Sequence, residues 1–382
     1  EAEFPVGRAP AHAALSPDGN LLYVTSLRGN AASSPEGGRP APDKEMRSGG
    51  GAVRVVDLSA RRTARVFKTG LAPYGVEVSS DGSRLFVVES LSDRVAILDA
   101  ASGKTLARAP VGREAKYLAL TPDGDRLVVG NGLSRSVSIL DARTGKLIET
   151  RDIGRASVGR QVACTPDGRW ALSAHLVSHD EQITSQINRG WMHSNGFTVM
   201  DLSRRGRRVT LLLDKLLDGA ANPWGLAVSG DGRRLYVSLS GVHEVAFVDL
   251  EKTLAFVEQV RSEEVVPLER DVELMVEKNG FARRVPSGGK GPRGLALSEP
   301  LGELLVANYF DDTVSVLDAS SGEIKALIPL YDKPPPLTLR RKGELLFNDA
   351  GITFERWFSC ASCPQEDATV DDGLIVVDDR RR

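Results

Sequence analysis

Short apolar runs recur along the chain, and many end with an apolar residue followed by aspartate, as in "VAILDAA" and "VSILDAR". Seven aspartates occupy this position: Asp57, Asp99, Asp141, Asp201, Asp249, Asp318 and Asp378. Another apolar run follows a glycine-containing turn, as in "SSDGSRLFV", and this marker also occurs seven times. Short apolar runs between such turns favour β-strands, and Asp-Gly favours tight hairpins. The pattern therefore predicts antiparallel strands joined by short turns.

The spacing of the repeat predicts the architecture. Asp57, Asp99 and Asp141 lie 42 residues apart, which is the length of a four-stranded propeller blade. Each unit supplies strand a, an Asp-Gly turn, strand b, a loop, strand c with its aspartate, a turn and strand d. Seven units predict an all-β, seven-bladed β-propeller. The last unit lacks strand d and the N-terminal "FPVG" resembles one, so we expect the N-terminal strand to join the last blade and close the ring.

Composition agrees with this fold and limits the partners. The chain of 382 residues has 38 Gly, 20 Pro and only 5% aromatic residues, which suits many short strands. Its net charge of −2 argues against a general polyanion binder such as a nucleic-acid-binding protein. No apolar run approaches the roughly 18 residues that a membrane span needs.

The ends of the sequence suggest where the protein resides. Residues 1–4, "EAEF", resemble an expression scar, and residues 5–382 then form a single propeller domain. A secretion signal would have preceded such a scar, so we expect a periplasmic, cell-surface or secreted protein. Three cysteines neither support nor exclude this location.

Strand b of the first unit contains "LYVTS" (Leu22 to Ser26). This motif resembles the one that names the YVTN family of bacterial β-propellers, and the resemblance covers nearly the whole chain. It implies the propeller fold but no particular activity, because one propeller fold hosts many functions.

Four insertions interrupt the regular repeat. Three are predicted in b–c loops, at residues 27–50, 176–195 and 350–372, and one in a d–a connection, at residues 262–291. In an up-and-down blade both kinds of connection emerge on the same face, which we call the insertion face. Long loops on a rigid scaffold commonly carry function, so we expect the binding site on this face. The alternative is that one face of the propeller simply tolerates insertions.

The residues that open strand a on the insertion face include three cations and two aromatic residues: Tyr74, Lys116, Arg160, Trp224 and Arg293. In a chain of nearly balanced charge, this concentration predicts a site for a small anionic ligand or an acidic partner. The alternative is that the lysine and arginine side chains project from loop ends into solvent.

The residues that close strand b form a predicted second layer, which includes Glu89, His175 and Asp349. His179 and His193 follow in the 176–195 insertion. Three imidazoles near a carboxylate suit copper or zinc, although a loop histidine also serves as an ordinary hydrogen-bonding group. Glu89 and Asp349, with two asparagines of the layer, could instead bind calcium in a lactonase-like hydrolase.

The segment "RRKGELLFNDAGITFERWFSCASC" ends in a Cys-x-x-Cys pair, Cys360 and Cys363. Together with "TSQINRGWM", it resembles bacterial YVTN propellers fused to a c-type cytochrome domain of the di-haem peroxidase kind. That resemblance implies an electron-transfer partner. Pro364 stands where a c-type haem site needs histidine, which argues against haem attachment. We therefore expect Cys360 and Cys363 to form a disulfide or to be two free thiols. The cytochrome portion itself is missing from the sequence.

Three hypotheses for function stay open, and whether the protein is an enzyme is undecided. The first is an extracytoplasmic, redox-associated propeller whose insertion face binds a metal or a small anionic ligand and supports a c-type cytochrome domain. The second is a lactonase-like, metal-dependent hydrolase. The third is a non-catalytic scaffold for protein interaction.

Overall fold

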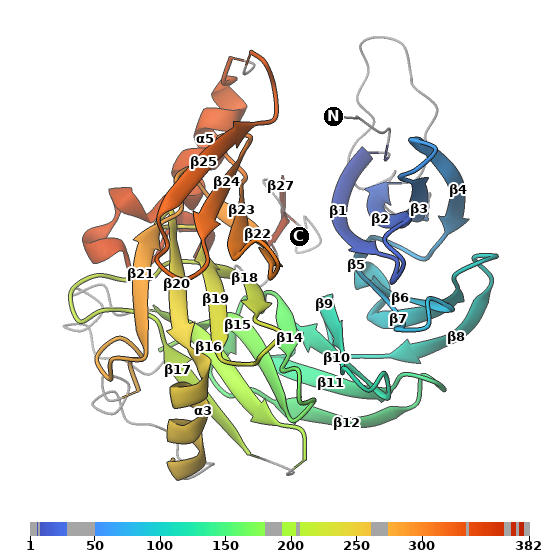
Figure 1. Cartoon of the computed structure of the whole chain (residues 1–382), viewed down its shortest axis with the longest axis horizontal. Coiled ribbons are helices and arrows are strands. Elements are labelled where there is room, and N and C mark those ends of the chain that lie inside the picture. The colour runs from blue at the N-terminus through green and yellow to red at the C-terminus, as the bar shows by residue number, and fades with distance from the viewer. Residues whose placement is uncertain are drawn as a thin grey trace, which may run out of the picture. The chain divides into compact units, whose positions relative to one another are not determined.

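The computed structural model describes residues 6, 8–28, 50–179, 193–203, 207–260, 274–333, 336–362, 368–371 and 374–377. The chain divides into two compact units, Glu1–Asp152 and Ile153–Arg382, and each is considered by itself. The described strands form an all-β propeller with six blades, three in each unit (Figure 1).

Unit 1 contains three antiparallel sheets, each of four strands in sequence order. The first strands of neighbouring blades pack together, β1 against β5 and β5 against β9. The strands are β1 (Arg8–Leu15), β2 (Leu21–Arg28), β3 (Ala52–Asp57), β4 (Arg62–Lys68), β5 (Pro73–Val78), β6 (Arg84–Glu89), β7 (Arg94–Asp99), β8 (Thr105–Pro110), β9 (Ala115–Leu120), β10 (Arg126–Asn131), β11 (Ser136–Asp141) and β12 (Leu147–Asp152).

Unit 2 begins with an irregular blade. Its strand a is split into two short strands, β13 and β14, which both pair with a nine-residue strand b. The strands are β13 (Ala156–Ser157), β14 (Val162–Cys164), β15 (Trp170–Ser178), β16 (His193–Asp201), β17 (Arg208–Leu212), β18 (Pro223–Val228), β19 (Arg234–Leu239), β20 (Glu244–Asp249), β21 (Ala282–Pro286), β22 (Pro292–Ser298), β23 (Glu303–Asn308), β24 (Thr313–Asp318) and β25 (Ile324–Pro329).

The turns have the chemistry that the repeat predicts. In the a–b turn of the second blade, the Ser79 hydroxyl donates to Asp81 Oδ1 at 2.6 Å, and Gly82 adopts a positive φ of 70°. Glycine takes this conformation at little steric cost. In the following c–d turn, Asp99 Oδ1 accepts a hydrogen bond from Ser102 N at 2.7 Å. Asp81 and Asp99 therefore close hairpins in this blade.

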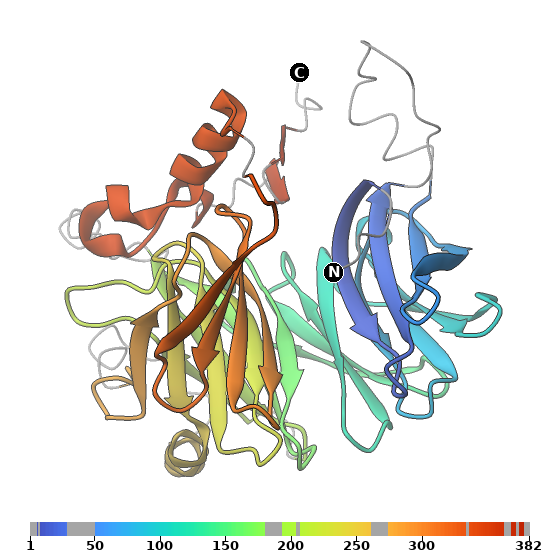
Figure 2. The same ribbon diagram turned by 45° about the horizontal axis from the view of Figure 1, so that its top comes forward.

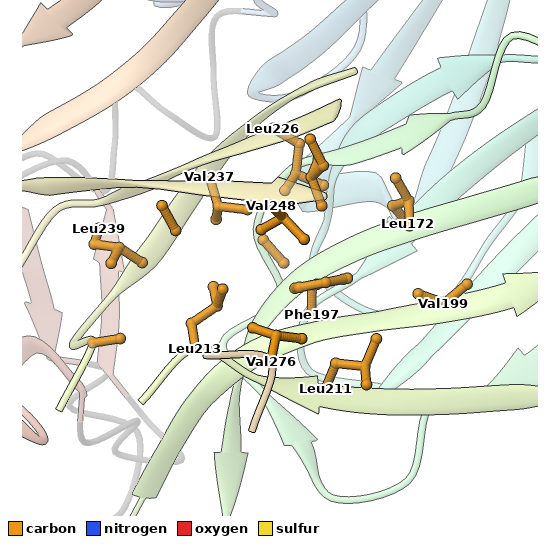
Figure 3. Close-up of a cluster of buried hydrophobic side chains, with 14 of the residues drawn as sticks. Leu172, Phe197, Val199, Leu211, Leu213, Leu226, Val237, Leu239, Val248 and Val276 are labelled. Atoms are coloured by element: carbon orange, nitrogen blue, oxygen red, sulfur yellow. The ribbon is translucent and has the colours of Figure 1, made fainter. Parts of the chain in front are cut away.

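A large core of buried side chains in the described part of unit 2 lies between its first two blades. Figure 3 shows Leu172 and Phe197 from the β13–β17 blade and Val237 and Val248 from the β18–β21 blade, all in one buried cluster. Each fully buried side chain of this kind contributes about 1.5–3 kcal/mol relative to exposure to water. This core holds the first two blades of the unit together.

The prediction of seven blades is wrong, because the segment expected as strand b of a seventh blade is helical. "LLFNDA" lies in the last turn of α5 (Leu339–Asn348) and in the 3-10 turn η2 (Ala350–Ile352). Thr338 caps α5, since its hydroxyl accepts a hydrogen bond from Arg341 N at 3.2 Å, and Arg, Lys, Glu and Leu favour helices. The predicted N-terminal closure by "FPVG" falls almost entirely outside the described residues.

The C-terminal strands β26 (Ala368–Asp371) and β27 (Leu374–Val377) pair only with each other among the described strands. Among the described residues, the sixth blade also lacks an inter-blade contact that the second and fifth blades make. Arg84 and Arg234 open strand b and donate to backbone carbonyls of the following blade, those of Arg143 at 2.7 Å and Ala319 at 3.0 Å. At the same position the sixth blade has Glu303, which pairs with Lys325 of its own blade at 3.6 Å. The contact that the second and fifth blades make is therefore absent among the described residues of the sixth blade.

The predicted position of the insertion at residues 262–291 also needs correction. The fourth strand of the blade is β21, which pairs with β20, so the extra residues lie in the c–d connection rather than in a d–a connection. They begin with α3 (Leu250–Gln259), which buries Leu250, Thr253 and Val257 at helical spacing. Figure 2 shows α3 and α5 at opposite ends of the unit 2 blades. The long insertions therefore do not all share one face.

The other insertions are only partly described. Residues 29–49 of the first and 180–192 of the second lie outside the described residues, and the second begins as an extension of β15 and β16. Two further 3-10 turns, η3 (Phe354–Arg356) and η4 (Cys360–Ser362), belong to the third. None of the described helices is long and apolar enough to cross a membrane.

Candidate functional site

Three of the five predicted ligand-binding residues meet in unit 2. Trp224 lies on β18 and Arg293 on β22, while Arg160 precedes β14, so all three are at the openings of successive strands a. The guanidinium carbon of Arg160 is 3.8 Å from the centre of the Trp224 ring, and that of Arg293 is 4.1 Å from the same centre. All three residues are only 8% exposed. They are therefore packed together rather than projecting into solvent.

Two residues that the sequence did not single out extend this arrangement. Arg293 also lies 3.7 Å from the centre of the Tyr309 ring, and Arg341 of α5 lies 4.2 Å from that centre. Arginine and aromatic side chains thus alternate over five residues, which we call the arginine–aromatic ladder: Arg160, Trp224, Arg293, Tyr309 and Arg341. Each cation–π contact is worth about 0.5–2 kcal/mol, and more when it is desolvated.

The two ends of the ladder differ in charge compensation. Arg341 pairs with Glu344 at 3.0 Å, and the Tyr309 hydroxyl donates to the same carboxylate at 2.9 Å. Burial raises the pKa of Tyr309, so the hydroxyl keeps its proton and can donate. No carboxylate of the described residues forms an ion pair with Arg160. Positive charge is therefore concentrated at the Arg160 end.

Tyr74 and Lys116 belong to unit 1 and form a separate cluster. Lys116 Nζ lies 5.7 Å from the centre of the Tyr74 ring and 3.1 Å from Glu114 Oε1. Tyr74 packs edge-on against Tyr117 with ring centres 5.2 Å apart, and the Tyr117 hydroxyl donates to the Tyr74 hydroxyl at 3.4 Å. The lysine here has a carboxylate partner, in contrast to Arg160.

The predicted histidine ligands lie on the long strands β15 and β16 or just beyond them. His175 is fully buried: its Nδ1–H donates to Leu176 O at 2.8 Å, and its Nε2 accepts from the Thr198 hydroxyl at 2.6 Å. Burial lowers the pKa of His175 to about 4, so the ring is neutral. His179 accepts from the Arg155 guanidinium at 3.1 Å and donates to the Ser194 hydroxyl at 2.7 Å. Both imidazoles are engaged in hydrogen bonds within unit 2.

The predicted carboxylate ligands also have protein partners. Glu89, in unit 1, accepts from Gly70 N at 2.7 Å and pairs with Arg108 at 3.4 Å. Asp349 follows α5 and lies 3.5 Å from His243 Nε2, a histidine that the sequence did not single out. The part of the chain that the structure describes contains no group of three or more His, Cys, Asp or Glu arranged to hold a metal ion. The metal site stays a prediction.

The C-terminal segment is anchored to unit 2 by buried groups. Trp357 is nearly inaccessible and packs with Val177, Leu212 and Met275. Its carbonyl accepts a hydrogen bond from Asn195 Nδ2 at 2.9 Å. The backbone that leads into the cysteine pair is therefore held in place by the blade that begins unit 2.

A buried polar network continues this anchor. Asp214 accepts from Asn195 N at 2.6 Å and from Ala220 N at 2.7 Å, and burial raises the pKa of Asp214 to about 7. Asn222 donates to the Ser359 hydroxyl and accepts from that of Ser362, both at 2.8 Å. Every side chain in the network has a partner, as buried polar groups require. These contacts position the segment that carries Cys360.

Cys360 is exposed, whereas Cys363 lies outside the described residues. A disulfide between them, or the expected lack of haem, therefore stays a prediction. Of the residues that the sequence missed, Tyr309 had one usable signal, since it follows Asn308 at the predicted end of strand b. Arg341 had none, because its segment was assigned to the wrong secondary structure.

Comparison with known proteins supports the class that the strands define, a β-propeller. Residues 68–184 match the family described as YNCE-like beta-propeller. The chain is 27% identical over 271 residues to the hydrazine synthase subunit beta of Kuenenia stuttgartiensis, which covers 70% of this chain and 58% of that protein. The match thus spans little more than half of the relative's length.

A solved structure, Kuenenia stuttgartiensis Hydrazine Synthase, is similar with a TM-score of 0.55 and 23% identity, covering 82% of this chain and 96% of that one. This likeness concerns the fold. The expectation of a propeller is confirmed, whereas the fusion to a cytochrome stays a prediction.

Proposed function

We propose that this protein is an extracytoplasmic, redox-associated propeller that binds a small anionic ligand at the arginine–aromatic ladder and serves a c-type cytochrome as its electron-transfer partner. One observation carries the ligand site: Arg160 and Arg293, both more than nine-tenths buried, share the ring of Trp224. Burying two cations beside each other is costly unless an anion compensates their charge.

The chemistry of guanidinium explains the preference for an oxyanion. Its planar face stacks on aromatic rings, and its edge presents N–H donors in a fork that matches carboxylate and phosphate oxygens. Arg160 stacks its face on the Trp224 ring, so the donors on its edge can be directed at a ligand. Because Glu344 compensates Arg341 and no carboxylate of the described residues pairs with Arg160, the anion belongs at the Arg160 end of the ladder.

Two observations support the redox association. The curated relative is named as a subunit of hydrazine synthase, and a segment that resembles the beginning of a c-type cytochrome domain is held on unit 2 by Trp357, Asn195 and Asn222. A rigidly held attachment point is what a propeller needs in order to present a second domain or a partner.

Isothermal titration calorimetry of the full chain with acetate, nitrite and phosphate tests the ligand site. We expect saturable binding of at least one anion, and Arg160→Met should weaken it by about tenfold or more, because it removes a charge-assisted hydrogen bond. Arg233→Met, which removes an exposed arginine elsewhere in unit 2, is the matched control. No saturable binding of the three anions, or equal affinity of the Arg160→Met protein, would contradict the proposed site.

A further inference from the structure

Helix α5 exposes apolar side chains that no described part of the chain covers. Leu339 is 88% exposed and Leu346 is 53% exposed. The opposite side of the helix carries Arg341 and Glu344, which hold it to the blade through Tyr309, and Asn348, which donates to the helix's own backbone. Helical spacing places Leu339, Gly343 and Leu346 together on the outward side, and we call these three residues the α5 ridge.

Gly343 gives a second indication that something packs on the ridge. Glycine inside a helix is less favourable than alanine, because it has more conformational freedom to lose on folding. A Cβ atom built at Gly343 would meet no atom within 4 Å, so the fold itself does not require glycine here. Glycine in the middle of an exposed apolar ridge lets another backbone or ring approach the helix closely.

The charges beside the ridge define what could pack there. Arg340 and Lys342 are exposed and, by helical spacing, flank the ridge on its two sides. The one carboxylate of the helix, Glu344, is turned to Tyr309 and Arg341. The ridge is thus apolar in its centre and positive at its edges, which fits a surface with an apolar centre and a rim of carboxylates.

The ridge is also held firmly, as a docking site needs to be. Arg341 fastens the helix through the Tyr309 carbonyl and Glu344. Beyond its end, Ala350 N donates to Gly241 O at 2.8 Å, and Arg356 pairs with Asp218 and Glu244. A partner that binds the ridge therefore does not have to order the helix first, which keeps the entropic cost of association low.

We propose that the α5 ridge docks an electron-transfer protein whose apolar contact surface is ringed by acidic side chains. This inference rests on the proposed function for the kind of partner, while the ridge supplies the place and the charge. A lipid surface is the competing occupant. Helices that bind membranes have a broad apolar face, whereas α5 offers two leucines on its outward side and is fixed to a blade.

Calorimetric titration of the full chain at low ionic strength tests the ridge with three probes: an acidic small c-type cytochrome, a basic one of similar size, and vesicles of anionic phospholipid. We expect the acidic cytochrome alone to bind, with an affinity that falls as salt is added, because exposed charges are screened. Leu346→Asp should weaken this binding by about tenfold or more. Leu301→Asp is the matched control, since Leu301 is an exposed leucine in the a–b turn of the sixth blade.

Gly343→Ala separates docking from a merely structural role. Alanine should raise the melting temperature of the protein, because it favours the helix. It should also weaken the binding of the cytochrome, because the added methyl group obstructs close approach. Failure of the acidic cytochrome to bind, unchanged affinity of the Leu346→Asp protein, or binding of vesicles instead would overturn the proposal. The anion titration of the ladder is independent of the ridge, so the two proposals fail separately.

Discussion

The openings of strands a form two clusters, one in each unit, with opposite solutions to the same problem of buried charge. In unit 1, Lys116 is buried beside Glu114 at 3.1 Å, and the aromatic residues Tyr74 and Tyr117 contact each other. In unit 2, the arginines lie between the aromatic rings, and Arg160 has no carboxylate partner among the described residues. The repeat therefore determines where a cation sits, and its neighbours determine whether that cation is available to a ligand.

The two clusters also differ in how the cation contacts the aromatic rings. Lysine contacts a ring as a point charge, whereas the planar guanidinium can stack on two rings at once. Arg293 does so with Trp224 and Tyr309, which come from neighbouring blades. The unit 2 cluster thus links blades through a stacked guanidinium, whereas the unit 1 cluster links the blades of β5 and β9 through the contact between the Tyr74 and Tyr117 rings.

The largest expected effect follows from removing the ring that two arginines share. Trp224→Ala should lower the free energy of unfolding by about 4 kcal/mol, because it leaves a cavity beside two buried cations. Tyr74→Phe, which removes only the hydroxyl contact in unit 1, should cost about 1 kcal/mol or less. Urea titration followed by circular dichroism measures both. Equal losses in the two variants would mean that the ladder has no special role in unit 2.

Much of the fold follows from the sequence, because strand periodicity and turn chemistry are local. The strand pairs and the hairpins closed by Asp99 and Asp81 were predicted from spacing alone. The number of blades was not, because "LLFNDA" has apolar residues that suit either a strand or a helix. The cap at Thr338 and the contact between Arg341 and Tyr309 stabilise the helix instead of a strand. The contact with Tyr309 depends on tertiary structure.

The candidate site was predictable only in part. Repeat alignment placed Arg160, Trp224 and Arg293 at equivalent positions, and the structure brings them together. The alignment could not show that Glu114 compensates Lys116, because that contact depends on side-chain directions. It also gave no sign of the buried network around Asp214, whose members lie far apart in the sequence and are joined only by folding.

The next expected effect concerns one carboxyl group in each unit: Glu77, which is partly buried, and Asp214, which is fully buried. Burial raises the pKa of Glu77 in unit 1 to about 7, so the folded state keeps the proton while the unfolded chain loses it near pH 4. Stability from this group is present at low pH and is lost as the pH rises to about 7. Glu77→Gln should remove this loss and raise the free energy of unfolding by about 2 kcal/mol at pH 8, with little effect at pH 4.

Asp214→Asn in unit 2 should change the free energy of unfolding in the opposite direction, by lowering it. Both oxygens of Asp214 accept hydrogen bonds, from Asn195 N, Asn195 Nδ2 and Ala220 N. An amide N–H2 in place of one oxygen would face these donors, so the variant should lose about 2 kcal/mol at pH 7. Urea titrations at several pH values measure both changes. Stabilisation by Asp214→Asn, or a pH profile unaltered by Glu77→Gln, would contradict this assignment of roles.

The smallest expected effect is that of a substitution in the unit 1 cluster, where the cation has a carboxylate partner. Lys116 opens strand a at a position equivalent to that of Trp224, yet its charge is taken up by Glu114 at 3.1 Å. Lys116→Gln should therefore change the affinity for small anions by less than about twofold, and since glutamine can still hydrogen-bond to Glu114, it should cost about 1 kcal/mol or less in stability. Calorimetric titration with the anion that binds the wild-type protein best measures the first quantity. If Lys116→Gln weakened anion binding as much as Arg160→Met does, charge compensation by Glu114 would not distinguish the two clusters. The anion site would then have to include unit 1.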